Sequence, residues 1–117
     1  MKLDMDVVRS LLLQIEEDTT LDHALIFEKS ETNPDTFYAL LKLNEAGYIN
    51  SIETNTWVGI VQIEVKSLTY EGHKFLDTIR DPKIYREAKK SVKSFASVSL
   101  DIFSKVAVQI LKDQLGI

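Results

Sequence analysis

Apolar residues at helical spacing predict an amphipathic helix near the start of the chain. Asp4 is a suitable N-cap for it, because a carboxylate can accept a hydrogen bond from the free N–H groups of the first turn. The next apolar run, 24–27, is short and is interpreted as a strand, although periodicity alone also allows a short helix. The stripe of the first helix follows spacings of three, four and three: Met5, Val8, Leu12 and Ile15.

A second helix is predicted over 34–46. Asn33 supplies its N-cap, and Pro34 fits the first helical position, where a missing N–H costs no hydrogen bond. Gly47 is expected to end the helix in the left-handed conformation. The residues expected to face the core are Phe37, Leu40 and Leu41, with Leu43 at the edge of that stripe.

A β-hairpin is predicted over 48–66, with 53–56 as its turn. Within 61–66 the odd positions are apolar and the even positions are polar, so one face meets the core and the other meets water. Further helices are expected from cap signals at Thr69 and at Asp81 followed by Pro82. The last helix is expected to open at Ser97 or Ser99 and to close at Gly116.

This order of elements predicts an α+β, mainly α fold of winged-helix type. Residues 1–80 form the expected winged-helix-like core, and residues 81–117 form a helical extension packed on it within a single structural domain. A complete helix-turn-helix needs a further helix just before Pro34, and only 18–33 is available for it. If 24–27 is a strand, the motif is therefore abbreviated. A winged helix is a binding scaffold, so the pattern favours a non-enzymatic binding module, although fold is only an analogy for function.

Three motifs carry a resemblance to a known family. The chain resembles an uncharacterised family of small bacterial and phage proteins, a domain of unknown function related to YjcQ-like winged-helix proteins. The likeness covers nearly the whole chain, with one departure: the family pattern has Trp at the position of Tyr70. The motifs are Asp4-Met5-Asp6 with Arg9, Glu45-Ala46-Gly47, and Leu68-Thr69-Tyr70-Glu71-Gly72-His73-Lys74-Phe75-Leu76-Asp77-Thr78-Ile79-Arg80-Asp81.

The resemblance implies a winged-helix fold and a phage or mobile-element context. It implies no catalytic residues, since the family has no established activity. The order of elements is also similar to that of winged-helix transcription regulators. In those proteins the helix matching 33–46 would be the recognition helix, and the hairpin would be the wing.

Charge is distributed unevenly along the chain. Residues 1–79 contain six Lys or Arg and fourteen Asp or Glu, a net charge of −8. Residues 80–94 contain six basic and two acidic residues, a net charge of +4, and the remainder is balanced. The winged part is therefore acidic, and the positive charge is concentrated in one later helix.

That later helix, 82–93, presents its cations on one face. Three interpretations remain open: a solvated outer face, a surface that tracks phosphates, or a contact with an acidic protein or membrane. The apolar residues Ile84, Tyr85, Ala88 and Val92 take the opposite face. The candidate binding residues are Lys83, Arg86, Lys90 and Lys93, with Lys89 beside them.

The predicted recognition helix has a poor electrostatic footprint for DNA. If its apolar stripe is buried, then Asp35, Tyr38, Lys42 and Glu45 point outward, and one lysine accompanies two carboxylates. Tyr38 and Lys42 are retained as candidate contacts. Two functions follow: a DNA-binding regulator of phage or mobile-element type, or a protein–protein interaction module of winged-helix shape that does not bind DNA.

The last helix is too apolar for an ordinary surface helix, since apolar residues span more than half of its circumference. Either it is clamped between the first helix and the winged unit, or it also packs against a second copy. Two-fold pairing is the commonest oligomer, so a homodimer is predicted. The candidate dimer contacts are Phe103, Ala107, Ile110 and Leu111.

Enzymatic chemistry finds little support in the sequence, and we predict no activity, no cofactor and no metal. The two histidines, His23 and His73, have no zinc-like spacing, and the four glycines are dispersed. The absence of cysteine excludes disulfides and is compatible with the cytoplasm. No apolar run approaches the ~20 residues of a membrane span, and no signal peptide is expected. Tyr48, Trp57 and Tyr70 are expected to cover the edge of the core.

Overall fold

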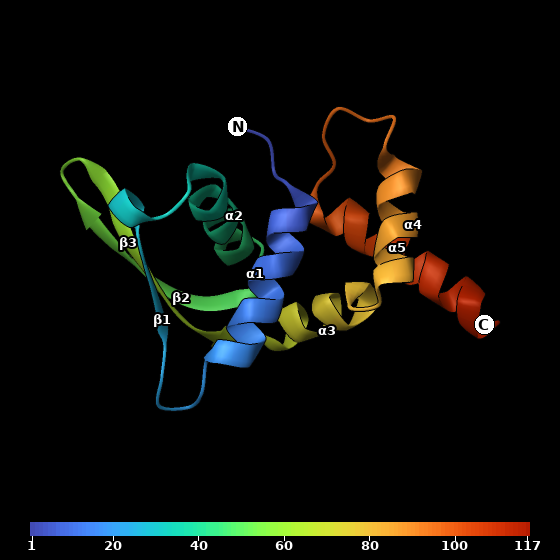
Figure 1. Ribbon diagram of the computed structural model, residues 1–117, viewed down its shortest axis with the longest axis horizontal. Helices are drawn as coiled ribbons and strands as arrows, with labels where there is room; N and C mark the ends of the chain where they lie inside the picture. The colour runs from blue at the N-terminus through green and yellow to red at the C-terminus, as the bar shows by residue number, and fades with distance from the viewer.

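Five α-helices and a three-stranded antiparallel sheet make up the chain in the computed structural model, which describes residues 1–117. The sheet and its hairpin occupy one end of the molecule, α4 and α5 occupy the other, and α1 and α3 lie between them (Figure 1). The elements are α1 (Met5–Asp18), β1 (Leu25–Glu28), the 3-10 turn η1 (Lys29–Glu31), α2 (Pro34–Glu45), β2 (Ile49–Thr56), β3 (Gly59–Leu68), α3 (Tyr70–Ile79), α4 (Pro82–Val92) and α5 (Leu100–Leu115).

The sheet has the strand order β1-β3-β2, and both neighbours run antiparallel to β3. Ile63 and Val65 of β3 are fully buried against the helices. Ile26 and Ile52 pair with Glu64 on the opposite face and are exposed to solvent. The predicted strand at 24–27 and the predicted hairpin are both confirmed.

The predicted position of the hairpin turn is wrong. Residues 53–56 continue β2, and the turn consists of Trp57 and Val58. Asn44 of α2 donates a hydrogen bond to Glu53 over 3.0 Å, which holds this part of the strand on the helix. Gly59 then takes a φ of 106°, a value that favours glycine and directs the chain into β3.

The core fills the space between the sheet and helices α1, α2 and α3, and it continues without a break into α4 and α5. In α2, Leu43 is fully buried and Leu41 is partly exposed, the reverse of their predicted roles. The reason is that α2 packs against α1 and against β2, so its buried arc includes Ala39 and Leu43. The spacing of apolar residues along the sequence does not show that a helix packs against two neighbouring elements.

Helix α5 packs on α3, which belongs to the predicted winged unit, but its other neighbour is α4 and not α1 as predicted. Its N-cap is Ser99, whose hydroxyl accepts a hydrogen bond from the N–H of Ile102, and Gly116 ends it at a φ of 75°. Phe103 lies edge-on to Tyr85 of α4, with 6.0 Å between the ring centroids. Helix α5 therefore joins the rest of the molecule through α3 and α4.

The start of α3 lies directly against the junction between α2 and β2. The N–H of Thr69 donates to the carbonyl oxygen of Tyr48, and its hydroxyl donates to the carbonyl oxygen of Gly47 over 2.6 Å. A Cβ atom on Gly72 would overlap the carbonyl group of Tyr48. Residue 72 must therefore lack a side chain for α3 to lie at this distance.

A polar cluster ties α4 to the beginning of α1. The hydroxyl of Tyr85 donates a short hydrogen bond to Asp6, and the ammonium of Lys89 lies 3.0 Å from the same carboxylate. The Tyr85 hydrogen bond, followed by Lys89, lowers the pKa of Asp6. Burial, followed by the Asp6 carboxylate, raises the pKa of Tyr85 above its usual range. Arg9 lies 5.2 Å from the ring centroid of Tyr85 and completes the cluster.

Replacing Gly72 by alanine is expected to destabilise the chain by about 3 kcal/mol, since overpacking against backbone atoms cannot be relieved by a rotamer change. Urea unfolding followed by circular dichroism would measure the loss. Glu71→Ala, at the exposed neighbouring position, is the control and should change stability by less than about 0.5 kcal/mol. Equal stability of Gly72→Ala and wild type would show that α3 is not held against Tyr48.

The Asp6 cluster predicts a pH-dependent contribution to stability. Because the folded-state pKa of Asp6 is lowered, its contribution is present above the unfolded pKa of about 4 and is lost as pH falls through the folded pKa. Asp6→Asn should therefore cost about 1 kcal/mol at neutral pH, after discounting for exposure of the pair. The difference from wild type should shrink in acid. A constant difference across the titration would contradict this assignment.

Candidate functional site

The cations of α4 divide into two groups. Lys83, Arg86, Lys90 and Lys93 are exposed and form no ion pair. Lys89 is committed to Asp6 and lies 5.8 Å from the ring centroid of Tyr85. We call the first four residues the cationic face.

The buried side of α4 is the one expected from the sequence, because Ile84, Tyr85 and Ala88 face the core. Asp81 caps the helix by accepting a hydrogen bond from the N–H of Lys83 over 2.7 Å. The cationic face is thus the solvent side of a helix fixed at its first turn and along its apolar side. Helix α1 lies between α4 and α2, so the cationic face does not adjoin α2 (Figure 1).

The exposed side of α2 offers no free cation. Lys42 lies 2.9 Å from Glu45 and 5.3 Å from the ring centroid of Tyr38. The hydrogen bond to Glu45 raises the pKa of Lys42, and the Glu45 carboxylate offsets the charge of the ammonium. The structure therefore brings the candidate residues Tyr38 and Lys42 together, and separates them from the candidates on α4.

The three aromatic residues near the hairpin have different surroundings. Tyr48 stacks on Phe75 with 5.0 Å between ring centroids and does cover the edge of the core. Trp57 at the tip of the hairpin is 97% exposed, and Tyr70 at the start of α3 is also exposed. The expectation that all three cover the core is wrong for Trp57 and Tyr70.

The four candidate dimer contacts also divide. Phe103 and Ala107 are completely buried in the chain's own core, because α5 turns them toward α3 and α4. Their side chains are therefore inaccessible to a second copy of the chain. Ile110 and Leu111 remain partly exposed, and Leu115 beyond them is 64% exposed.

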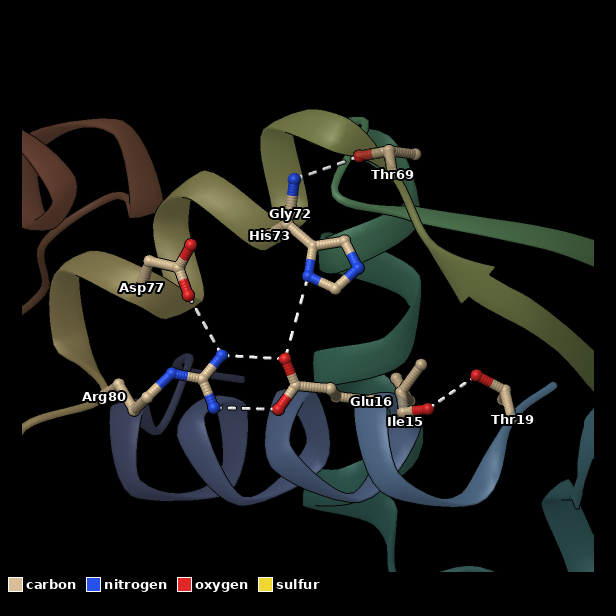
Figure 2. Close-up of polar contacts among 8 residues, drawn as sticks. All are labelled: Ile15, Glu16, Thr19, Thr69, Gly72, His73, Asp77 and Arg80. Carbon is tan, nitrogen blue, oxygen red and sulfur yellow. Dashed lines mark hydrogen bonds and ion pairs between the residues drawn. The ribbon is translucent and has the colours of Figure 1, made fainter.

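Residues of the motif 68–81 hold the fold together (Figure 2). The hydroxyl of Thr69 accepts a hydrogen bond from the N–H of Gly72 over 3.0 Å and caps α3. Gly72 makes room for the carbonyl of Tyr48, as described above, and Asp81 caps α4. Four apolar members of the motif are buried, and Tyr70 is exposed: the buried ones are Leu68, Phe75, Leu76 and Ile79.

Two charged or titratable members of the motif, Arg80 and His73, converge on Glu16 of α1. Arg80 donates two hydrogen bonds to Glu16, over 2.8 and 2.7 Å, and a third to Asp77 over 3.0 Å (Figure 2). Nδ1 of His73 lies 3.7 Å from the same Glu16 carboxylate. The Arg80 hydrogen bonds lower the pKa of Glu16, and Glu16 in turn raises that of Arg80 above its usual range. Sequence inspection missed this network because Glu16 and Arg80 lie 64 residues apart.

A polar cleft of about 750 Å³ lies between the end of α1, residues 19–24, β3 and the start of α3. Both histidines line it, together with Glu16 and Glu64. No three His, Cys, Asp or Glu side chains lie close enough together to hold a metal ion. The cleft brings titratable groups together without forming a recognisable catalytic constellation.

Comparison with known proteins agrees with the resemblance to an uncharacterised family. The model of the family described as "Hypothetical protein (DUF2513)" matches residues 2–99. An uncharacterised protein of Haemophilus influenzae is 29% identical over 120 residues, which cover 99% of this chain and 100% of that protein. No solved structure matches the chain, and none of its helices has the length and apolar character needed to cross a membrane. The chain belongs to the DUF2513 family.

Proposed function

We propose that this chain is a non-enzymatic winged-helix module that binds nucleic acid through the cationic face of α4. The observation that carries the proposal is that unpaired cations gather on one face of α4, whereas the chain as a whole is acidic. The cationic face has four unpaired cations on a chain whose overall net charge is −4. Phosphate contacts by Lys and Arg supply most of non-specific nucleic-acid affinity, so this face is the best candidate for a phosphate-tracking surface.

The topology supports the winged-helix part of the proposal. Helix α1, strand β1, turn η1, helix α2 and the β2–β3 hairpin follow one another in the order of a winged helix, with β3 central in the sheet. The middle helix of a helix-turn-helix is reduced here to the three residues of η1. With Lys42 neutralised by Glu45, α2 does not supply the charge of a recognition helix.

The family resemblance stated from the sequence motifs adds a setting to this proposal. It implies a phage or mobile-element context, and we propose that the chain contacts DNA in that context. Binding through α4 would be largely independent of base sequence, because phosphate contacts position a protein without reading bases.

Charge reversal at Lys90 and Lys93 is expected to abolish binding to a random-sequence duplex. For wild type, log K should fall with log salt at a slope of about −3 to −4, as expected for four phosphate contacts. Fluorescence anisotropy over a salt series would measure both quantities. The matched control is Lys29→Glu with Lys66→Glu, two exposed lysines without an ion pair, outside α4, whose reversal changes net charge equally. Equal binding by the Lys90/Lys93 variant and wild type would discard the proposal.

A second variant separates α4 from the conventional mode of winged-helix binding. Lys42→Ala removes the only cation on the exposed side of α2, and should leave the affinity for the same duplex within about twofold. A loss comparable to that of the α4 variant would instead place the contact on α2.

We further propose that the last turns of α5 pair with a second copy. They project beyond α4 (Figure 1), and they carry the partly exposed Ile110 and Leu111 and the exposed Leu115 and Ile117. Pairing two such ends would remove apolar surface from water at roughly 25 cal/mol per Å².

Sedimentation equilibrium at micromolar concentration should therefore give the mass of two chains. Leu115→Asp is expected to give one chain, because a carboxylate would be buried at the contact. Ile102→Asp, on an exposed part of α5 away from its end, is the control and should remain dimeric. One chain for the wild type would contradict the pairing.

A further inference from the structure

A groove with an apolar floor adjoins the cationic face of α4, and we call it the α4 groove. It has a volume of about 580 Å³ and lies between the N-terminal segment, α4 and α5. Lys90 and Lys93 line this groove and are also members of the cationic face, so the two surfaces are continuous. The apolar lining consists of the fully buried Phe103 and the partly buried Leu3, Met5 and Val92.

The charged groups of the lining are three ammonium groups and one carboxylate. Lys89 is held by Asp6 at 3.0 Å, whereas Lys90 and Lys93 form no ion pair. The carboxylate is that of Asp4, whose Oδ1 accepts a hydrogen bond from the N–H of Asp6 over 2.9 Å and caps α1. The α4 groove therefore offers two unpaired cations beside an apolar floor, together with the second oxygen of one carboxylate.

We propose that the α4 groove receives an unstacked base of single-stranded nucleic acid, while Lys90 and Lys93 bind phosphates of the same strand. The inference rests on the function proposed for α4. It specifies the kind of nucleic acid and adds a contact with a base. In a duplex the flat faces of the bases are covered by stacking, whereas a single strand can turn a base outward against the protein.

The combination of charge and apolar surface favours this occupant over a partner that carries phosphates alone. Phosphates are attracted by the unpaired lysines but gain nothing from apolar side chains beside them. A single strand supplies both the negative charge and flat faces that leave water when they meet Leu3, Met5 and Val92. The ring of Phe103 is completely buried, so the base would pack against aliphatic side chains rather than stack on an aromatic ring.

The carboxylate of Asp4 gives the α4 groove a preference among bases. A carboxylate accepts a hydrogen bond from the exocyclic amino group of cytosine. Thymine presents a carbonyl oxygen at the corresponding position, and two acceptors repel each other. Since the two bases are similar in size, we expect a strand of deoxycytidine to bind more tightly than a strand of thymidine.

An abasic strand separates the contribution of the bases from that of the phosphates. Fluorescence anisotropy would compare a deoxycytidine strand of about 16 nucleotides, an abasic strand with the same number of phosphates, and a random-sequence duplex of the same length. The deoxycytidine strand should bind about tenfold more tightly than either of the others, as expected for one base contact at the weaker end of the usual range.

Replacing Leu3 by serine removes apolar surface from the α4 groove and leaves every lysine in place. Leu3 precedes the first helix, so the substitution does not interrupt it. The deoxycytidine and abasic strands should then bind within about twofold of each other. Leu41→Ser, at a partly exposed leucine of α2, is the matched control and should keep the wild-type difference. Circular dichroism would establish that both variants are folded.

Replacing Asp4 by asparagine tests the base preference and preserves the helix, because asparagine is an equally good N-cap. Wild type should bind the deoxycytidine strand about fivefold more tightly than the thymidine strand. Asp4→Asn should reduce this ratio to within about twofold, since an amide donates as well as accepts. Glu87→Gln removes the same charge from a residue of α4 that does not line the groove, and should keep the wild-type ratio.

Equal affinities for the deoxycytidine strand, the abasic strand and the duplex would overturn the inference. If Lys90→Glu with Lys93→Glu weakened all three, the function proposed for α4 would still stand. Binding of none of the three would overturn both. A polyglutamate peptide of similar length that competes as well as the deoxycytidine strand would show that charge alone is recognised, and an unchanged ratio in Asp4→Asn would overturn the role of that carboxylate.

Discussion

The close approach of α3 to the carbonyl of Tyr48 is the constraint on which the rest of the architecture depends. Gly72 permits it, and the hydrogen bonds of Thr69 to Gly47 and Tyr48 fix it. The direction of α3 then determines where Arg80 and α4 lie, since α4 follows after only Arg80 and Asp81. A small change at residue 72 would therefore be transmitted through α3 to the helical extension, while the hairpin would keep its own hydrogen bonds.

Internal pairing decides which charges are available to a partner. Arg9 donates to the carbonyl oxygens of Ile79 and Arg80, and Arg80 itself is committed to Glu16 and Asp77. Lys89 is held by Asp6. Arg9, Arg80 and Lys89 therefore hold elements of the fold together and are not available to a partner. Residues 80–94 contain six basic residues, but only the four of the cationic face are unpaired.

Local signals in the sequence predict the elements well, because each depends on neighbouring residues. Asn33, Asp81 and Ser99 cap helices as expected, and the alternation along β3 places Ile63 and Val65 in the core. The hairpin turn lies beyond its predicted position because Thr54, Asn55 and Thr56 still pair with β3, through a register shift that local signals do not show. The same limit applies to the candidate site. Pairing of Lys89 with Asp6, 83 residues away, cannot be seen from helical spacing.

Leu41 shows how surface exposure can be hidden in a pattern that otherwise predicts a fold. The apolar stripe of α2 places Leu41 in the core, yet it lies partly exposed in an apolar groove between η1, α2 and the start of β3, because α2 turns Leu43 inward instead. An apolar residue at the edge of a buried stripe has the same sequence signature whether it completes a core or lines a groove on the surface. Only the second neighbour of the helix distinguishes the two cases, and here that neighbour is β2.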